Sequence, residues 1–276
     1  MIDIGNYNTL SILKFEPQGA YLTDDVESVL LPKRYVDSAW KEGHKLEVFV
    51  YKDSEDRIVA TTERPKITVG QFACLTVSSI TPHGAFMDWG LQKDLLVPFS
   101  EQERDMVEGR EYLVHLYFDY ETERLVGSTQ LEDFLEHDEI ELEEKQEVQI
   151  TIWRTSDLGY KAIINQKYLG QLYHNEVFQK ISEGDMLTGF VQKKREDGKI
   201  DLRLQRSGYI MIDEHAQKIL EKLKENEGYL PFYDKSDAEE IVREFAMSKK
   251  NFKKGIGSLY KQKIISIEEK GIRLKD

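Results

Sequence analysis

The chain has 276 residues, of which 40% are hydrophobic and 32% charged, a composition typical of a folded protein with two or more domains. No apolar run approaches the ~20 residues that a membrane span needs, and no basic stretch precedes an apolar block at the start. We therefore expect a cytoplasmic protein without a membrane partner. The single cysteine, Cys74, excludes an internal disulfide framework, and its apolar surroundings favour a buried, inert thiol over a nucleophile.

The net charge of −13 argues against a nucleic-acid partner, because affinity for a phosphate backbone comes from Lys and Arg. The charge is distributed unevenly, however. Residues 207–276 carry 14 basic and 13 acidic side chains, whereas residues 1–206 carry 24 and 38. Nine of the acids lie in the run "EDFLEHDEIELEEKQE" (132–147), which we interpret as a solvated linker. The acidic excess is therefore local and does not exclude such a partner.

Three segments, residues 8–62, 67–129 and 146–205, share one pattern of elements. Each begins with an alternating strand, continues with a second strand led by glycine, and has a short third strand that ends in Pro or Tyr. A Glu-Gly turn then opens a long strand, and an acidic turn leads into the last strand. Five short strands in ~60 residues are typical of a small Greek-key barrel. The Glu-Gly turns are Glu42-Gly43, Glu108-Gly109 and Glu183-Gly184.

The C-terminal segment has a different character. The stretch "IDEHAQKILEKLKENEGYL" places apolar residues at helical spacing and ends at Gly228. In "SDAEEIVREF", Ser236 and Glu239 have the spacing of a capping box, which predicts a second helix. A third helix is expected from Ser248, and "KIISIEEKGIRLKD" predicts a hairpin. Three helices and a terminal hairpin are the order of a winged-helix domain. The apolar positions expected to face the core of the first helix are Ile212, Ala216, Ile219, Leu220 and Leu223.

The repeats resemble the S1 RNA-binding domain, an oligonucleotide-binding (OB) barrel. The second repeat carries the most specific match, in "HGAFMDWG", "KDLLVPFSE" and "VEGREYLVHLYFDYETERLVGS". The third repeat matches mainly through "EGDMLTGFVQKKREDGKIDLRLQ", and the first mostly by its spacing. Three S1-like repeats followed by a winged helix resemble, as a whole, the conserved virulence factor B family of bacterial RNA-binding proteins.

This resemblance implies a fold that is mainly β with some α. Three S1-like OB-fold five-stranded barrels are expected at residues 1–64, 65–131 and 145–207, and a winged-helix domain at 210–276. The resemblance also implies a non-catalytic regulator of gene expression that acts on single-stranded RNA, with a pyrimidine or U-rich preference by analogy. The winged helix is expected to contribute to binding.

In the S1 family, outward-facing residues of the second strand stack on bases. The corresponding residues are His83 and Phe86 in the second repeat, and Gln18 and Tyr21 in the first. In the third repeat they fall near Leu158 and Lys161, with Tyr160 beside them. Strand alternation places Phe86 and Trp89 on opposite faces. Trp89 is therefore expected in the core, whereas for Phe86 both a surface platform and a core or inter-domain contact remain open.

The S1 family has a histidine at the end of the third strand, which this chain lacks. Pro32 and Pro98 stand there in the first two repeats, and Tyr173, next to His174, stands there in the third.

An acidic and basic pair of the family corresponds to Asp53 with Arg57, and to Asp119 with Arg124. Such an arginine can meet phosphate, stack on a base or form a turn salt bridge. Lys93, in the turn between the second and third strands, is available to phosphate.

The strongest basic signal is "SKKNFKKGIGSLYKQKI", with six lysines and no acid. Phe252, Ile256 and Leu259 can face the core of this third helix. Lysines favour phosphate contacts over base reading, and a solvated face without a partner is the alternative. The lysines that form two adjacent pairs along one side are Lys249, Lys250, Lys253 and Lys254.

Motifs for catalysis, cofactors or metal binding are absent from the sequence: there is no H-E-x-x-H, C-x-x-C, G-x-S-x-G or G-K-[ST] pattern. We therefore expect no enzyme, no cofactor and no metal. Two rival hypotheses remain. One is a protein-interaction or ribosome-associated scaffold, favoured by the acidic barrel region and the missing histidines. The other is a winged-helix transcription regulator that binds duplex DNA.

Overall fold

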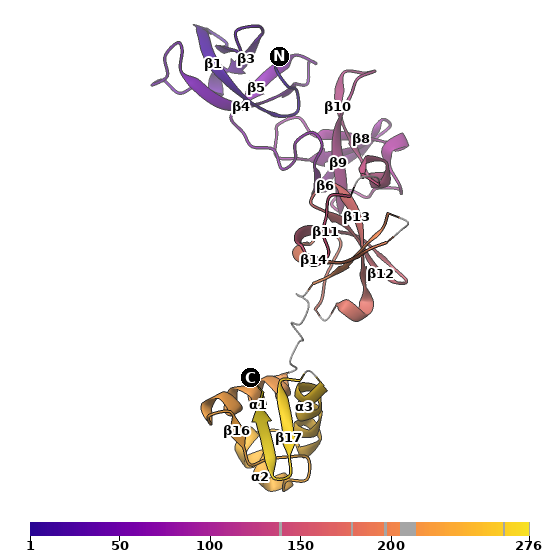
Figure 1. Ribbon diagram of the computed structural model, residues 1–276. Coiled ribbons are helices and arrows are strands. Elements are labelled where there is room, and N and C mark those ends of the chain that lie inside the picture. Colours follow the sequence, from indigo (N-terminus) through magenta and orange to yellow (C-terminus); the bar gives the residue numbers. More distant parts are fainter. Residues whose placement is uncertain (138–139, 178, 196–197, 205–213, 262, 276) are drawn as a thin grey trace. The chain divides into compact units, whose positions relative to one another are not determined.

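A computed structural model describes residues 1–137, 140–177, 179–195, 198–204, 214–261 and 263–275. The chain divides into two compact units, Met1–Leu204 and Gln205–Asp276. The first unit is built from β-sheets, and the second combines helices with a small sheet (Figure 1).

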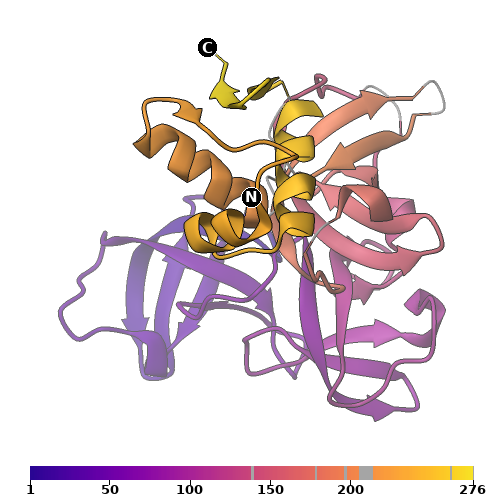
Figure 2. The same ribbon diagram turned by 90° about the horizontal axis from the view of Figure 1, so that it is seen from below.

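The first segment forms a closed barrel (Figure 2). Its strands are β1 (Tyr7–Glu16), β2 (Gly19–Thr23), β3 (Ser28–Pro32), β4 (Lys45–Lys52) and β5 (Ile58–Thr61), and they pair in the order β1-β2-β3-β5-β4. Side chains alternate between the two faces, so every second residue of a strand points inward. The buried core consists of Leu10, Ile12, Ala20, Leu22, Val29, Leu31, Val48, Val50 and Ala60.

The third segment repeats this topology. Its strands are β11 (Glu147–Ser156), β12 (Gly159–Ile164), β13 (Tyr168–Tyr173), β14 (Met186–Lys194) and β15 (Ile200–Arg203), in the order β11-β12-β13-β15-β14. A parallel pairing of β13 with β15 closes the ring, as β3 with β5 does in the first barrel. The predicted five-stranded closed barrel is confirmed for the first and third segments.

The second segment is a five-stranded sheet rather than a barrel closed by hydrogen bonds. Its strands are β6 (Phe72–Thr81), β7 (Gly84–Asp88), β8 (Leu95–Pro98), β9 (Glu111–Asp119) and β10 (Arg124–Ser128). The order is β10-β9-β6-β7-β8, and among the described residues no ladder joins β8 to β10. The two edge strands meet through side chains instead. A Cβ on Gly127 would lie 2.9 Å from Val97 Cγ2 and 3.2 Å from Leu95 Cδ2. The expectation of a closed barrel is therefore corrected for the second segment, which we call the second barrel because side chains, not a ladder, join its edge strands.

A glycine opens the second strand of each segment for a steric reason. Gly19, Gly84 and Gly159 have φ of 155°, 140° and 149°. A Cβ on these residues would lie 2.0, 2.3 and 2.0 Å from a carbonyl oxygen of the following strand. No other residue type fits such an approach. The three glycines therefore fix the same register in all three segments, so Tyr21, Phe86 and Lys161 occupy equivalent positions, as do Pro32, Pro98 and Tyr173.

The first and second segments share one hydrophobic cluster. Phe49 and Tyr51 of β4 pack with Trp89, which follows β7 and is 2% exposed. The Trp89 ring lies 5.7 Å from the Phe49 ring and 6.3 Å from the Tyr51 ring, edge-on to both. The prediction that Trp89 is a core residue is confirmed, and the core in question joins two barrels.

The second and third segments share another cluster, which includes part of the predicted linker. A 3-10 helix covers Leu131–Phe134, and Leu131 and Leu135 are buried with Trp153 of β11 and Ile163 of β12. Glu136 N donates to Lys167 O at 2.9 Å. The interpretation of this acidic run as a solvated linker was therefore wrong at these positions, because its apolar residues fill the joint between two barrels.

The C-terminal unit has the predicted three helices, α1 (Glu214–Glu225), α2 (Ala238–Phe245) and α3 (Lys249–Lys261). The predicted hairpin is confirmed as β17 (Ile265–Glu268) and β18 (Gly271–Leu274), and β16 (Tyr229–Leu230) adds a strand beside β18. Of the residues expected in the core of the first helix, Ile212 lies outside the described residues and Leu220 is only partly buried. The residues of α1 and α3 predicted to face the core that are buried are Ala216, Ile219, Leu223, Phe252, Ile256 and Leu259.

The cap of α2 differs from the prediction by one residue. Asp237, not Ser236, is the N-cap, and its carboxylate accepts from the backbone amides of Glu239 and Glu240 at 2.8 and 3.3 Å. The Ser236 hydroxyl instead accepts from Tyr233 N at 2.9 Å. A carboxylate suits this position better than a hydroxyl, because it also interacts favourably with the positive end of the helix dipole.

Candidate nucleic-acid interface

A cleft of about 510 Å³ opens beside the β7–β8 face of the second segment. One wall comes from β7, β8 and the start of β10, and the other from the end of β4 and the turn that follows it in the first barrel. In OB folds this sheet face is the one that binds oligonucleotides. Four of the residues predicted from the sequence line the cleft, namely His83, Phe86, Lys93 and Arg124.

Phe86 is partly exposed and lies in the cleft wall, whereas Met87 and Trp89 turn inward. Ser78 Oγ lies 2.9 Å from Phe86 O, at the bulge where β6 and β7 change register. His83 is exposed in the turn before β7, where its backbone N–H donates to Thr81 Oγ1 at 3.2 Å. Tyr51 and Trp89 also line the cleft but are buried, so the rings exposed to a ligand are those of Phe86 and His83.

Two of the three cations that line the cleft, Arg124 and Lys93, reach across to the β4–β5 turn of the first barrel, and the third is Lys52 of β4. Arg124 Nη2 lies 2.6 Å from Asp56 Oδ2, and Lys93 Nζ lies 3.6 Å from Asp56 Oδ1. Lys93 Nζ also donates to Asp53 O at 2.7 Å. The turn therefore carries the acid that pairs with both cations.

The predicted pair of Asp119 with Arg124 does not form. Asp119 accepts from the Thr122 hydroxyl at 2.5 Å and from Glu121 N at 3.0 Å. Arg124 follows Asp119 by five residues, whereas Arg57 follows Asp53 by four, and the Arg124 guanidinium donates to Asp56 instead.

The predicted pair of Asp53 with Arg57 is confirmed. Arg57 donates to Asp53 Oδ2 through both Nε and Nη2, at 2.9 and 2.7 Å. Partial burial raises the pKa of Asp53, but the hydrogen bonds from Arg57 outweigh it and hold that pKa below its ordinary value. This pair stiffens the turn that closes the cleft.

Tyr21 lies on the equivalent face of the first barrel but does not line the cleft. Its ring is 5.1 Å from Lys14 Nζ, and its hydroxyl accepts from Gln18 Nε2 at 3.3 Å. Lys14 also pairs with Glu16 at 2.9 Å. Tyr21 therefore forms a separate, partly exposed aromatic position next to a cation.

The equivalent position in the third barrel is Lys161, and it is occupied. Lys161 forms an ion pair with Glu132, and its ammonium lies 5.2 Å from the centre of the Trp153 ring. Tyr160 packs against the barrel core and meets the His174 ring edge-on at 5.3 Å. The segment that joins the second and third barrels thus covers Lys161, whereas the equivalent residue of the second barrel, Phe86, is open to the cleft.

Tyr173 and His174 lie at the far end of the third barrel's face. The Tyr173 hydroxyl donates to Asp201 at 3.2 Å and accepts from Arg195, which also pairs with Asp201 at 2.9 Å. The His174 ring nitrogen Nε2 is 3.3 Å from Ser156 O. These two predicted residues are near each other but are engaged in contacts within their own barrel.

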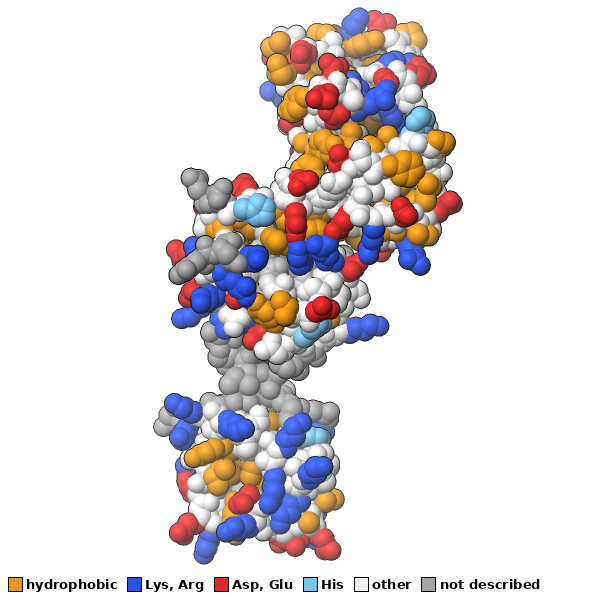
Figure 3. Space-filling model, turned by 90° about the vertical axis from the view of Figure 1, so that its right-hand side faces the viewer, with side chains coloured by type: hydrophobic (Ala, Val, Ile, Leu, Met, Phe, Trp, Pro, Cys, Tyr) orange, Lys and Arg blue, Asp and Glu red, His pale blue; other side chains and the backbone are white. Residues whose placement is uncertain are grey.

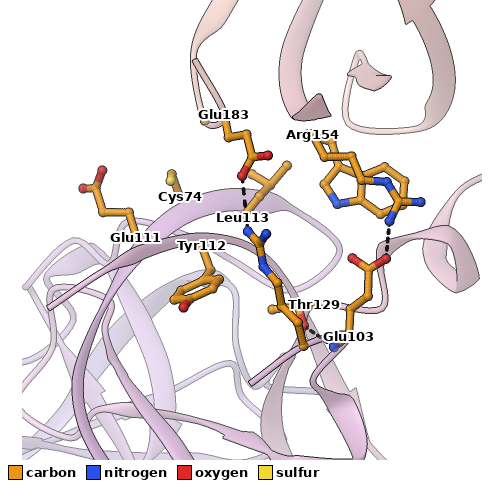
Figure 4. A pocket seen from close by; sticks show the side chains of 11 residues that line it. Cys74, Glu103, Glu111, Tyr112, Leu113, Thr129, Arg154 and Glu183 are labelled. Atoms are coloured by element: carbon orange, nitrogen blue, oxygen red, sulfur yellow. Dashed lines mark hydrogen bonds and ion pairs between the residues drawn. The ribbon is translucent and has the colours of Figure 1, made fainter. Parts of the chain in front are cut away.

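A second cavity of about 230 Å³, at the joint of the second and third barrels, was not found from the sequence (Figure 4). Arg104 and Glu183 face each other across it at 3.2 Å, and Arg154 pairs with Glu103 (Figure 4). Burial raises the pKa of the Cys74 thiol in its wall to about 11, so the thiol is protonated and unreactive at neutral pH.

The lysines of α3 lie in the C-terminal unit and form a surface of their own. Lys250, Lys253 and Lys254 are exposed, whereas Lys249 is partly buried and donates to Lys235 O at 3.5 Å. Figure 3 shows many lysine and arginine side chains on the visible face of this unit. Gly255 lets α3 approach α1 closely, since a Cβ there would lie 2.8 Å from Ile219 Cδ1.

Within the described residues, no group of three or more His, Cys, Asp or Glu side chains could hold a metal ion. The helices formed by the described residues are too short or too polar to span a membrane.

Comparison with known proteins agrees with this architecture. The S1 domain model matches residues 4–63 and 69–130, and the model of the CvfB-like winged helix domain matches residues 217–274. S1 and winged-helix domains are types of nucleic-acid-binding domain. The matches therefore cover the first two segments, which enclose the cleft, and most of the C-terminal unit.

Curated relatives match over most of the chain. Conserved virulence factor B of Staphylococcus aureus (strain bovine RF122 / ET3-1) is 29% identical over 259 residues, which cover 86% of this chain and 82% of the relative. Conserved virulence factor B of Staphylococcus saprophyticus is 29% identical over 241 residues, with shares of 84% and 80%.

Among solved structures, a multidomain protein with nucleic acid binding domains from Streptococcus pneumoniae TIGR4 is 22% identical. The match covers 99% of this chain and 98% of that one, with a TM-score of 0.45. The two matched domain types in their order along the chain, together with the relatives, place the chain in the conserved virulence factor B family.

Proposed function

We propose that the protein is a non-catalytic RNA-binding regulator that binds single-stranded RNA and influences gene expression after transcription. The observation that carries the proposal is the cleft on the β7–β8 face, where Phe86 and His83 stand beside Lys93 and Arg124. Stacking of a base on an aromatic side chain contributes about 1–3 kcal/mol, and a neighbouring cation can hold the adjoining phosphate. An open aromatic face beside two cations supplies both.

The lysines of α3 supply a second contact with phosphate in this proposal. An ammonium acts as a point charge and meets phosphate without reading bases, unlike the bidentate guanidinium of arginine. The helix contains lysines but no arginine. We therefore assign sequence preference, pyrimidine or U-rich by family analogy, to the cleft, and affinity for the backbone to the helix.

The test is Phe86→Ala. Loss of one stacked base weakens binding of a labelled single-stranded RNA of about 12 nucleotides roughly 5- to 100-fold, as read by fluorescence anisotropy at low and high salt. Phe99→Ala is the matched control, because Phe99 is an exposed phenylalanine of the same segment that does not line the cleft. Equal effects of the two variants would contradict the assignment of the cleft.

A protein-interaction or ribosome-associated scaffold is the second candidate. It is favoured by the ion pairs that already engage Lys93, Arg124 and Lys161. The same titration separates the candidates when single-stranded DNA and duplex DNA are added as ligands. Preference for single-stranded RNA supports the proposal, preference for the duplex supports a DNA-binding regulator, and no binding at low salt supports the scaffold.

A further inference from the structure

The β4–β5 turn of the first barrel is built to hold one carboxylate in the cleft. Asp56 N donates to Asp53 O at 3.0 Å, and Asp53 Oδ1 accepts from the backbone amides of Glu55 and Arg57 at 2.9 and 3.0 Å. Asp56 itself has φ of 57°, a left-handed conformation that Asp and Asn adopt more readily than most residues. The turn therefore fixes the direction in which the Asp56 side chain points.

Asp56 contacts two of the three cations that line the cleft, Arg124 and Lys93, whereas Lys52 pairs with Glu123. Its two oxygens lie 2.6 Å from Arg124 Nη2 and 3.6 Å from Lys93 Nζ. The hydrogen bond from Arg124 holds the pKa of Asp56 below its ordinary value, so the group is ionised at neutral pH. The other acids nearby have other partners: Asp94 accepts from the Ser78 hydroxyl at 2.6 Å, and Glu123 pairs with Lys52 at 3.4 Å.

We infer that Asp56 occupies the place of an RNA phosphate in the cleft and acts as an intramolecular competitor that RNA must displace. The inference rests on the proposed function and adds a regulation of the same site. A phosphodiester and a carboxylate both present anionic oxygens to Arg124 and Lys93, and the negative charge of Asp56 repels a phosphate that approaches the same two cations. The intrinsic affinity of the cleft is therefore reduced by the cost of breaking the Asp56 contacts.

Displacement has a second consequence, because Asp56 belongs to the first barrel and both cations belong to the second segment. When phosphate takes the place of Asp56, the contacts of that carboxylate with Arg124 and Lys93 are lost, which leaves the hydrogen bond from Lys93 Nζ to Asp53 O to join the turn to these cations. RNA binding is thereby coupled to the junction between the two barrels.

The experiment compares Asp56→Asn with Glu55→Gln in the full chain. Asn keeps the size of the side chain and tolerates the left-handed backbone, so this variant removes only the charge. Glu55 is the matched control, since it lies in the same turn and pairs with Arg57 at 2.8 Å rather than with the cleft cations. The probe is labelled single-stranded RNA of about 12 nucleotides, within the site size of an OB fold.

We expect Asp56→Asn to tighten RNA binding about 3- to 10-fold at low salt, the size of effect that a partly exposed ion pair with two cations allows. Glu55→Gln should change it less than about 2-fold, because it releases no cation of the cleft. The double variant Asp56→Asn/Arg124→Gln should bind RNA no more tightly than Arg124→Gln alone. Thermal melting of each variant confirms that it is folded.

The outcomes separate this inference from the proposed function. Equal tightening by Asp56→Asn and Glu55→Gln would mean a general charge effect and would overturn the inference. No tightening, with Phe86→Ala still weakening binding, overturns the inference and leaves the proposed function standing. Absence of RNA binding in every variant, Asp56→Asn included, overturns both.

Discussion

One position of the sheet is open to a cleft in the second barrel and covered in the third. Phe86 and Lys161 have the same register relative to the glycine that opens their strand. Phe86 lies in the wall of a cleft of about 510 Å³, whereas Lys161 is paired with Glu132 and lies over Trp153. The fold is the same at both positions. The difference comes from the neighbouring chain: residues 131–135 cover Lys161, whereas the β4–β5 turn of the first barrel lines the cleft opposite Phe86.

An OB barrel in a tandem array can therefore use its ligand-binding face to contact a neighbouring barrel. In the third barrel that face is part of a hydrophobic cluster with Leu131, Leu135 and Trp153. A face that buries apolar side chains against a neighbour is no longer available to a base. Three features account for the difference and can be tested by mutation: the shared register, the covering segment and the ion pair.

The largest effect is expected from the register. Gly84→Ala and Gly159→Ala each force a Cβ to within 2.3 and 2.0 Å of a backbone carbonyl oxygen, so the strands must separate. We expect each to lower the free energy of unfolding by about 3 kcal/mol or more, as measured by urea denaturation. Gly109→Ala is the control: Gly109 has φ of 77° but nothing within 4 Å of its Cβ site, so its cost of about 1 kcal/mol measures backbone strain alone.

A smaller but still large effect is expected from the segment that covers the third barrel. Leu131 is fully buried, and Leu131→Ala should cost about 2–4 kcal/mol of unfolding free energy because it leaves a cavity in the joint. Asp133→Ala, two residues away and exposed, should change stability by less than about 0.5 kcal/mol. Equal stabilities of the two variants in denaturant would contradict the assignment of Leu131 to a buried core at this joint.

The smallest effect is expected from the ion pair itself. The hydrogen bond from Lys161 holds the pKa of Glu132 below its ordinary value of 4.5. A depressed pKa in the folded state stabilises above the unfolded pKa, and this contribution is lost as the pH falls through the folded pKa. Because Glu132 is half exposed, Glu132→Gln should cost under about 1 kcal/mol at pH 7. Thermal melting between neutral and acidic pH measures it, and a difference from wild type that persists at the lowest pH would contradict the assignment.

Much of the fold could be predicted from the sequence because its determinants are local. The glycine that opens each second strand, the alternation along the strands and the helical spacing of Phe252, Ile256 and Leu259 each reside in one short stretch. The closure of the second sheet could not be predicted in this way. It depends on whether two edge strands reach hydrogen-bonding distance, and the strand pattern is the same in either case.

The candidate site could be predicted only in part, and for a related reason. His83, Phe86, Lys93 and Arg124 were found because they lie within one repeat, at positions that the S1 pattern marks. Asp56 was missed because its partners are 37 and 68 residues away in another barrel. Trp89 was expected in the core of its own repeat, yet it also packs against the first barrel. Contacts between repeats carry no periodic signal.

One contact between the second and third barrels bears on the order in which the chain folds during synthesis. The backbone amide of Phe72, in the first position of β6, donates to Gln166 Oε1 at 2.6 Å, across 94 residues of sequence. A ribosome makes roughly 5–20 residues per second, so the second barrel waits several seconds for this acceptor. Until then the amide is satisfied only by water. The start of β6 therefore reaches its final hydrogen-bonded state only after the third barrel has been translated. In this sense the third barrel is an assembly partner of the second.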